Sequence, residues 1–86
     1  MHGIKQNHVE AARWITKASE QGDADAQTTI GRAYYEGKGV LRDYVTAYMW
    51  LSRPTAQGNK SAKEELDSLE HNMSTGQVAE AQRLVR

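Results

Sequence analysis

The fold is decided by residues 23–58, which read DADAQTTIGRAYYEGKGVLRDYVTAYMWLSRPTAQG. When the chain is compared with itself, the residues on either side of this stretch match it at an offset of 36 positions. Identical pairs include Trp14 with Trp50 and Gly22 with Gly58, so both tryptophans of the chain fall in register. A fixed period of about 20–50 residues is typical of repeat architectures. The sequence therefore predicts a structural repeat with this period.

Apolar residues recur at helical spacing within the repeat. A stripe at i, i+3, i+4 and i+7 runs from Ala11 to Ala18, and the same spacing returns from Ala47 to position 54. A second stripe, at i, i+4, i+7 and i+8, begins at Ala26. This spacing indicates amphipathic helices, whereas a half-buried strand needs a strict alternation that no stretch shows. We therefore expect an all-α chain.

Local signals divide the chain into five expected helices. N-caps and capping boxes satisfy free N–H groups of a first turn, and a Gly after the last turn tolerates the left-handed conformation. The N-terminal signals are Asn7 with Glu10, Asp23 or Asp25, Asp43, Asn59, and Ser74 with Gln77. The C-terminal signals are Gly22, Gly37 and Gly58, and the last helix is expected from about Thr75 to Arg86.

Pro54 interrupts the helix expected over residues 43–57. It removes a backbone N–H and crowds the carbonyl of Trp50, which costs about 3 kcal/mol inside a regular helix. We therefore expect a kink or an early end of this helix near Arg53. Because Ala18 stands at the matching position one period earlier, Pro54→Ala is expected to raise the melting temperature.

The pattern of the complete unit resembles that of a known family. The residues concerned are Ala26-Gln27, Ile30-Gly31, Tyr34, Gly37-Lys38-Gly39-Val40, Asp43-Tyr44, Ala47, Trp50 and Gln57-Gly58. They are similar to the Sel-one-like repeat (SLR), a relative of the tetratricopeptide repeat (TPR), and depart from its pattern at Ile30, Pro54 and Thr55. The resemblance implies an α/α superhelix, a right-handed solenoid of antiparallel helix pairs that ends in a C-terminal capping helix.

The same resemblance divides the chain, treated as a single domain over residues 1–86, into four parts. These are the second helix of a preceding repeat (3–22), a complete repeat (23–58), the first helix of a degenerate repeat (59–73) and a capping helix (74–86). The third part is degenerate because Asp67 and Glu70 replace Gly31 and Tyr34. The last part resembles the polar-faced cap that keeps such arrays from stacking further.

Four repeated residues are expected to be structural and not to contact a ligand: Trp14, Tyr34, Ala47 and Trp50. Gly31 and Ala47 would let neighbouring helices approach closely, and Trp50 would fill the space between units. Truncating a buried Trp to Ala costs about 3–5 kcal/mol. That is a large part of the net stability of a chain this small, which is about 4–13 kcal/mol.

Charge and composition exclude several classes of protein. The chain has 11 Lys and Arg against 11 Asp and Glu, and it has no Cys. A disulfide framework and a Cys-ligated zinc site are therefore excluded. The balanced charge argues against a nucleic-acid partner, and no apolar run approaches the roughly 20 residues that span a bilayer. We expect a soluble protein, cytoplasmic by default, without membrane insertion.

Residues of types that often act in catalysis are present, but none of them forms part of a catalytic motif. The imidazoles are His2, His8 and His71, and none is part of an H-x-x-x-H or H-E-x-x-H arrangement. The segment 37–39, Gly-Lys-Gly, follows a helix and lacks the remaining residues of a phosphate loop, so it is interpreted as a turn. The acidic cluster over residues 64–70 is interpreted as a solvated helix face. We expect no enzyme and no catalytic, cofactor or metal site.

Binding of a peptide or protein partner is the leading interpretation. Stacked helix pairs curve, and their first helices line a concave side that forms an extended binding surface. The groove positions of the related tetratricopeptide fold fall on Asp25, Thr28, Arg32 and Tyr35 in the complete repeat and on Ser61, Glu64, Ser68 and His71 in the degenerate one. A polar surface with one aromatic group suits recognition of a peptide's backbone and charges. The alternative, that these are only solvent-facing helix positions, stays open.

Two functions from different classes follow. The first is an adaptor or scaffold that binds its partner through the concave helix face, which is what the resemblance implies. The second is a structural or self-associating fragment, which would form a homodimer through the exposed N-terminal end. Val9, Trp14 and Ile15 would then supply the apolar patch that drives association.

Overall fold

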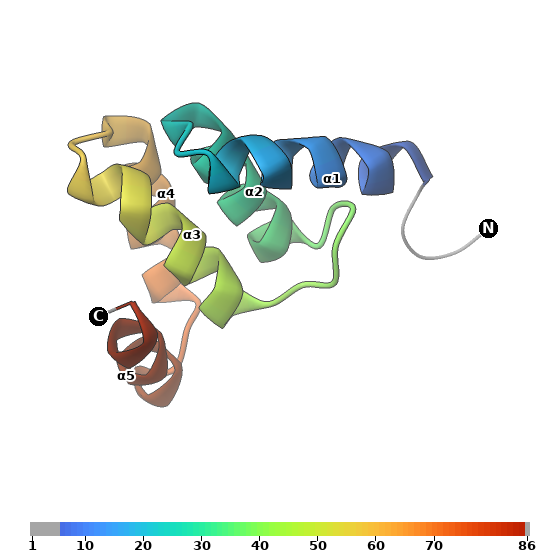
Figure 1. The fold of residues 1–86 in the computed structure, drawn as a ribbon. Coiled ribbons are helices and arrows are strands. Elements are labelled where there is room, and N and C mark those ends of the chain that lie inside the picture. The colour runs from blue at the N-terminus through green and yellow to red at the C-terminus, as the bar shows by residue number, and fades with distance from the viewer. Residues whose placement is uncertain (1–5, 86) are drawn as a thin grey trace.

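The computed structural model describes residues 6–85, apart from the side chain of Gln6, and these residues form five α-helices (Figure 1). The helices are α1 (Gln6–Glu20), α2 (Ala24–Glu36), α3 (Tyr44–Ala56), α4 (Lys60–His71) and α5 (Thr75–Leu84). The described residues contain no strand. The prediction of an all-α chain is confirmed.

The N-caps of α2 to α5 lie where the sequence predicts them. Asp23, Asp43 and Asn59 each accept, through a side-chain oxygen, the backbone N–H three residues later, at 2.9, 3.1 and 2.8 Å. At α5 a capping box is present: Ser74 Oγ accepts the N–H of Gln77 at 3.1 Å, and Gln77 Oε1 accepts the N–H of Ser74 at 2.9 Å. These bonds satisfy N–H groups that the first helical turn leaves free.

The capping box predicted at Asn7 is wrong. Helix α1 already includes Gln6, so Asn7 lies inside the helix. An N-cap residue needs a non-helical backbone, which this position does not have. Asn7 and Glu10 therefore have the spacing of a capping box, but they do not mark the start of the helix.

The helices pack in the order of the chain. Helix α2 contacts α1 on one side and α3 on the other, whereas α3 is contacted by α2, α4 and α5. In Figure 1, α1 extends away from the other helices toward the N-terminus, and α3 lies among its three neighbours. The main cluster of buried residues is accordingly centred on α3. It consists of Ala47, Tyr48, Leu51, Leu69, Met73 and Ala81.

Two glycines allow close contacts that a side chain would prevent. A Cβ atom on Gly31 would lie 2.7 Å from Leu51 Cγ, so α2 and α3 pack closely because this position is bare. A Cβ atom on Gly39 would lie 2.2 Å from the carbonyl oxygen of His8, and Gly39 also has a left-handed φ of +79°. The loop between α2 and α3 is therefore pressed against the backbone of α1. The interpretation of this loop as a turn is consistent with the left-handed backbone of its glycines.

The expected structural role of Trp14 is not found. Its side chain is 71% exposed, whereas the repeat-related Trp50 and Tyr34 are half-buried and Ala47 is buried. The physical reason is that α1 packs mainly against α2, so the opposite face of α1 has no neighbouring helix among the described residues. The ammonium group of Lys17 lies 5.2 Å from the Trp14 ring centroid and is the contact that this ring makes on the surface.

Of the kink or early helix end expected near Arg53, the early end is wrong. Helix α3 continues through Pro54 to Ala56, and the Pro54 ring is fully buried. Because of this burial, Pro54→Ala would lose about 1.6 kcal/mol of apolar packing, which offsets part of the roughly 3 kcal/mol helix penalty. We therefore expect the substitution to raise stability by only about 1 kcal/mol, and a thermal melt of the variant checks it. A melting temperature below that of the unaltered chain would show that packing dominates.

Candidate functional site

The groove residues expected from the sequence lie on α2 and α4, two neighbouring and roughly parallel helices. Their hydrogen bonds show that the two helices run in the same direction. Arg32 of α2 bonds to Glu65, and Tyr35, three residues later, bonds to Asn72, seven residues after Glu65. Helix α3 connects them and packs against both. We call the surface formed by Asp25, Arg32, Tyr35, Ser61, Glu64, Ser68 and His71 the α2/α4 face.

An ion pair links the middle of the two helices. Arg32 Nε donates to Glu65 Oε2 at 2.9 Å, and the two side chains are 42% and 25% exposed. A pair with this much solvent contributes at most about 1 kcal/mol to stability. Its main effect is to fix the guanidinium group between α2 and α4, with part of it still accessible from outside.

Tyr35 makes the second link between the helices. Its hydroxyl oxygen accepts a hydrogen bond from Asn72 Nδ2 at 2.7 Å, and Asn72 Nδ2 also donates to the carbonyl of Ser68 at 3.0 Å. The ring packs edge-on against Tyr44, with centroids 5.7 Å apart and an interplanar angle of 78°. Because the hydroxyl accepts in this bond, its own proton is left for donation to another group. Tyr35 is therefore held in place while remaining half-exposed.

The structure separates the expected groove residues into three groups by their exposure. Thr28 is 6% exposed, and its hydroxyl donates to the Ala24 carbonyl at 2.9 Å, so the expectation that it lines a groove is wrong. The residues with exposed side chains on the face are Asp25, Ser61, Glu64, Ser68 and His71. Arg32 and Tyr35 are half-buried and connect the two helices. The remaining face is polar, with one partly exposed aromatic ring.

Residues 1–23 and 24–59 each match the Sel1 repeat, and together they make up more than half of the chain. The chain belongs to the Sel1 repeat family. The second match starts at the first residue of α2 and ends after α3, so one Sel1 repeat coincides with the α2–α3 pair.

A solved structure supports the fold of this Sel1 repeat protein. The chain is similar to c5321, described as a protective antigen present in uropathogenic Escherichia coli strains and displaying an SLR fold. The two share 34% sequence identity with a TM-score of 0.86 over 94% of this chain. The chain spans 18% of the length of c5321, so the likeness establishes a common repeat fold for that part only. No curated protein matches the chain.

Sequence reasoning missed two residues of the face in this Sel1 repeat protein, Glu65 and Asn72. Each directly follows an expected groove residue, Glu64 or His71; Glu65 is half-buried and bonds to Arg32, whereas Asn72 is exposed and bonds to Tyr35. A signal was present in the opposite charges of Arg32 and Glu65. This signal was missed because groove positions were transferred along the chain by the 36-residue period. That transfer does not show which residues of adjacent helices contact each other.

The acidic residues of α4 do not gather into a site. Lys63 lies 3.3 Å from Asp67 within the same helix, and Glu65 forms an ion pair with Arg32. Among the described residues, no group of three or more His, Asp or Glu side chains is placed to hold a metal ion. Over the same residues, no helix combines the length and the hydropathy needed to cross a bilayer.

Proposed function

We propose that this Sel1 repeat protein is an interaction module that binds a peptide or protein partner on the α2/α4 face. The observation that carries the proposal is the pair of links between the helices, Arg32 with Glu65 and Tyr35 with Asn72. They fix the spacing of α2 and α4, so that a partner meets a surface already in its binding geometry. Preorganised surfaces of this kind lose less conformational entropy on binding.

The chemistry of the α2/α4 face suits a polar, extended partner. Tyr and Arg are, with Trp, the side chains that most often dominate binding energies at protein interfaces; Arg32 lies in the middle of the face and Tyr35 at the C-terminal ends of α2 and α4. Around them, Glu64, Ser68 and His71 offer exposed acceptors and donors. The membership in the Sel1 repeat family and the SLR-fold neighbour support a module that interacts with proteins.

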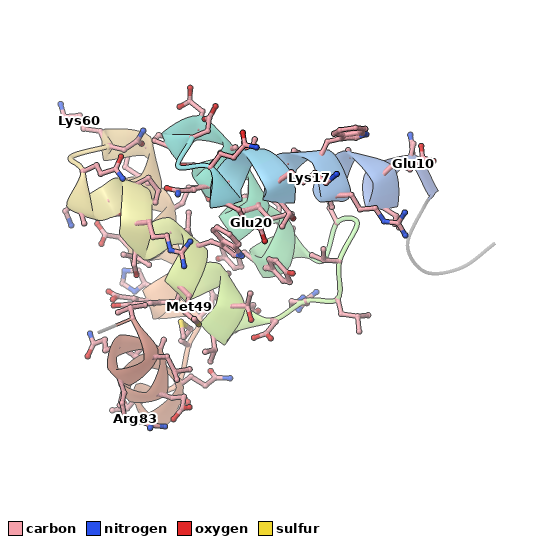
Figure 2. The ribbon with its side chains drawn as sticks, viewed as in Figure 1. Glu10, Lys17, Glu20, Met49, Lys60 and Arg83 are labelled. Atoms are coloured by element: carbon pink, nitrogen blue, oxygen red, sulfur yellow. The ribbon has the colours of Figure 1, made fainter. Side chains whose placement is uncertain are left out.

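The test compares two double variants of the chain. Ser68→Arg with His71→Arg changes exposed positions on the face without touching either link between the helices. Glu10→Arg with Glu20→Arg introduces the same side chains at exposed positions of α1 and serves as the control (Figure 2). Affinity capture from an extract of the source organism, with quantification by mass spectrometry, should show at least about tenfold less partner for the face variant, about 1.4 kcal/mol of binding.

The control variant should retrieve the same partners as the unaltered chain, and both variants should keep its melting temperature. If the face variant and the unaltered chain retrieve equal amounts of the same proteins, the partner binds elsewhere. The proposal for the α2/α4 face would then be overturned.

A second candidate function is self-association through the N-terminal end. The observation in its favour is the exposure of Trp14, next to the half-buried Val9 and Ile15 on α1. Size-exclusion chromatography with light scattering at micromolar concentration tests it. A dimer that becomes a monomer in Trp14→Ala or Ile15→Ala would support this function, and a monomer at every concentration would remove it.

A further inference from the structure

The hydrogen bond between Tyr35 and Asn72 has a direction that a neighbouring carbonyl fixes. Asn72 Nδ2 donates to the hydroxyl oxygen of Tyr35 at 2.7 Å and to the backbone carbonyl of Ser68 at 3.0 Å. A carbonyl can only accept, so the amide nitrogen of Asn72, and not its oxygen, must lie against Ser68. The same nitrogen then meets Tyr35, whose hydroxyl oxygen accepts. The O–H proton of Tyr35 is therefore directed away from Asn72.

The end of α4 explains why the Ser68 carbonyl is available. Asn72 is the C-cap of this helix, and its backbone N–H bonds to the Leu69 carbonyl at 2.9 Å. The Ser68 carbonyl thus lacks the backbone partner that a continuing helix would give it, and the Asn72 side chain takes that place. One side chain therefore both closes α4 and orients the Tyr35 hydroxyl.

The other link between the helices also ends in donors. Arg32 bonds to Glu65 through Nε alone, and its side chain is 42% exposed. The terminal nitrogens of a guanidinium group can only donate. Arg32 and Tyr35 are three residues apart on α2, so they are neighbours on the helix surface. Between α2 and α4, the two anchored side chains thus offer N–H and O–H groups, and a partner must supply acceptors there.

The charges around these donors favour a neutral acceptor over a carboxylate. Glu65 already pairs with Arg32, and the carboxylates of Asp25 and Glu64 are exposed on the same face. A further anion would be repelled by these like charges. The carbonyl oxygens of a peptide backbone carry no net charge. They lack a backbone partner wherever a segment is extended and not part of a sheet.

We propose that Tyr35 and Arg32 donate to main-chain carbonyl oxygens of an extended partner segment, and that Asn72 is the positioning residue that keeps the Tyr35 proton available. This inference rests on the proposed function, because it takes the α2/α4 face as the binding surface, and it adds the chemical class of the partner. A helical partner does not suit these donors, since its carbonyls are bonded within the helix. A proline-rich segment suits them best, because it has no N–H groups and stays extended.

The probe is an acetylated and amidated peptide of about ten prolines, which offers only carbonyl acceptors. Titrated into the isotope-labelled chain, it should cause saturable NMR shifts at Arg32, Tyr35 and Ser68. A capped peptide of the same number of glutamates, which the repulsion of its charges keeps extended, is the matched anionic probe. It should bind about tenfold more weakly. No saturable shifts at these residues with the proline peptide, or equal or tighter binding of the glutamate peptide, would overturn the proposal.

Removal of one hydroxyl group tests the donor. Tyr35→Phe should bind the proline peptide about threefold to tenfold more weakly, as expected for the loss of one neutral hydrogen bond. Tyr34→Phe, which removes a phenol oxygen from a residue outside the α2/α4 face, is the control and should bind as before. Both variants should keep the melting temperature of the unaltered chain. Undiminished binding by Tyr35→Phe would show that this hydroxyl does not donate to the partner.

Reversal of the hydrogen bond tests the positioning residue. In Asn72→Asp the introduced carboxylate can only accept, so it takes the Tyr35 proton for itself. This variant should therefore lose about as much affinity as Tyr35→Phe. The double variant should lose no more than Tyr35→Phe alone, because Asn72 acts through Tyr35. Additive losses would mean that Asn72 acts on binding by another route, and they would overturn its assignment as a positioning residue.

Failure of this inference can be told from failure of the proposed function. Ser68→Arg with His71→Arg blocks the α2/α4 face whatever the polarity of its hydrogen bonds. If that variant loses its captured partner while Tyr35→Phe and Asn72→Asp bind the proline peptide like the unaltered chain, the face is right and the inference is wrong. If the blocked face captures as much partner as the unaltered chain, both are overturned.

Discussion

Helices α1 and α3 carry the same repeat pattern in two different surroundings. Leu51 on α3 is 0% exposed, whereas the related Ile15 on α1 is half-buried, and Trp50 is half-buried where Trp14 is 71% exposed. A basic residue lies over each tryptophan ring, Lys17 at 5.2 Å and Arg53 at 4.7 Å. The local structure is therefore repeated while the burial is not. Burial in this fold depends on how many helices surround a residue, and α3 has three such neighbours.

The strongest test of this difference compares Leu51→Ala with Ile15→Ala. Leu51→Ala should lower the free energy of unfolding by about 3–5 kcal/mol, because it leaves a cavity in the main core. Ile15→Ala should cost about 1 kcal/mol, since its side chain is already partly in water. Urea unfolding of both variants measures the two values. Similar losses would show that α1 is as well packed as α3.

The next test concerns the contact between the loop and α1. Gly39→Ala should cost at least about 2 kcal/mol, because the added Cβ meets the His8 carbonyl and the left-handed backbone adds about 1–2 kcal/mol. Gly58→Ala is the matched control, since its φ is +89° and nothing lies within 4 Å of an added Cβ. Hydrogen exchange should accelerate in α1 more than in α4 for Gly39→Ala alone. Equal destabilisation by both substitutions would mean that the contact with α1 is unimportant.

Substitution of the two tryptophans is expected to give a smaller difference in the free energy of unfolding. Trp14→Ala should change the free energy of unfolding by no more than about 0.5 kcal/mol, as is usual for surface positions. Trp50→Ala should cost about 2 kcal/mol, below the value for a fully buried tryptophan because the ring is half-buried. Thermal melts of the two variants, with identical buffers, measure the difference. A larger loss for Trp14→Ala would contradict the exposure seen on α1.

The smallest effect depends on pH and arises only near α3, because Ala12 stands where α3 has Tyr48. Burial raises the pKa of the Tyr48 phenol above its ordinary value of about 10, and the charge of Glu70 acts in the same direction. Between the unfolded and the folded pKa, the folded state holds a proton that the unfolded chain has lost. Stability is therefore complete below about pH 10 and falls as the pH rises through that range, by up to about 1.4 kcal/mol per pH unit.

Tyr48→Phe removes this contribution and should unfold with a shallower decline between about pH 9 and pH 11. Urea midpoints of the variant and the unaltered chain across this range give the comparison. Parallel declines would mean that the phenol is not the group responsible.

Most of the local structure could be predicted from the sequence. The helices and the caps at Asp43, Asn59 and Ser74 depend on residues within a few positions of each other, and these caps were found. The burial of Trp14 could not be predicted in this way, because it depends on which helices cover α1. Pro54 was misjudged for the same reason, since a local helix penalty says nothing about the space that its ring fills.

The candidate site was predicted only in outline. The assignment of the groove to α2 and α4 follows from the 36-residue period and stays a prediction. Thr28 was misplaced because its hydroxyl bonds to its own helix backbone, and Glu65 and Asn72 were missed because contacts between helices shift the pairing by one position. Such shifts depend on how two helices pack in three dimensions. A fixed offset along the chain gives no information about that packing.

The contact of Gly39 with His8 joins one repeat to the one before it through backbone atoms. Helix α1 therefore cannot separate from α2 without also releasing the loop that leads into α3. In repeat proteins, coupling between neighbouring units determines how far unfolding spreads. Opening of α1 should thus also release the loop before α3, up to about residue 43, and not stop at the Gly22 turn, while α2 stays packed on α3.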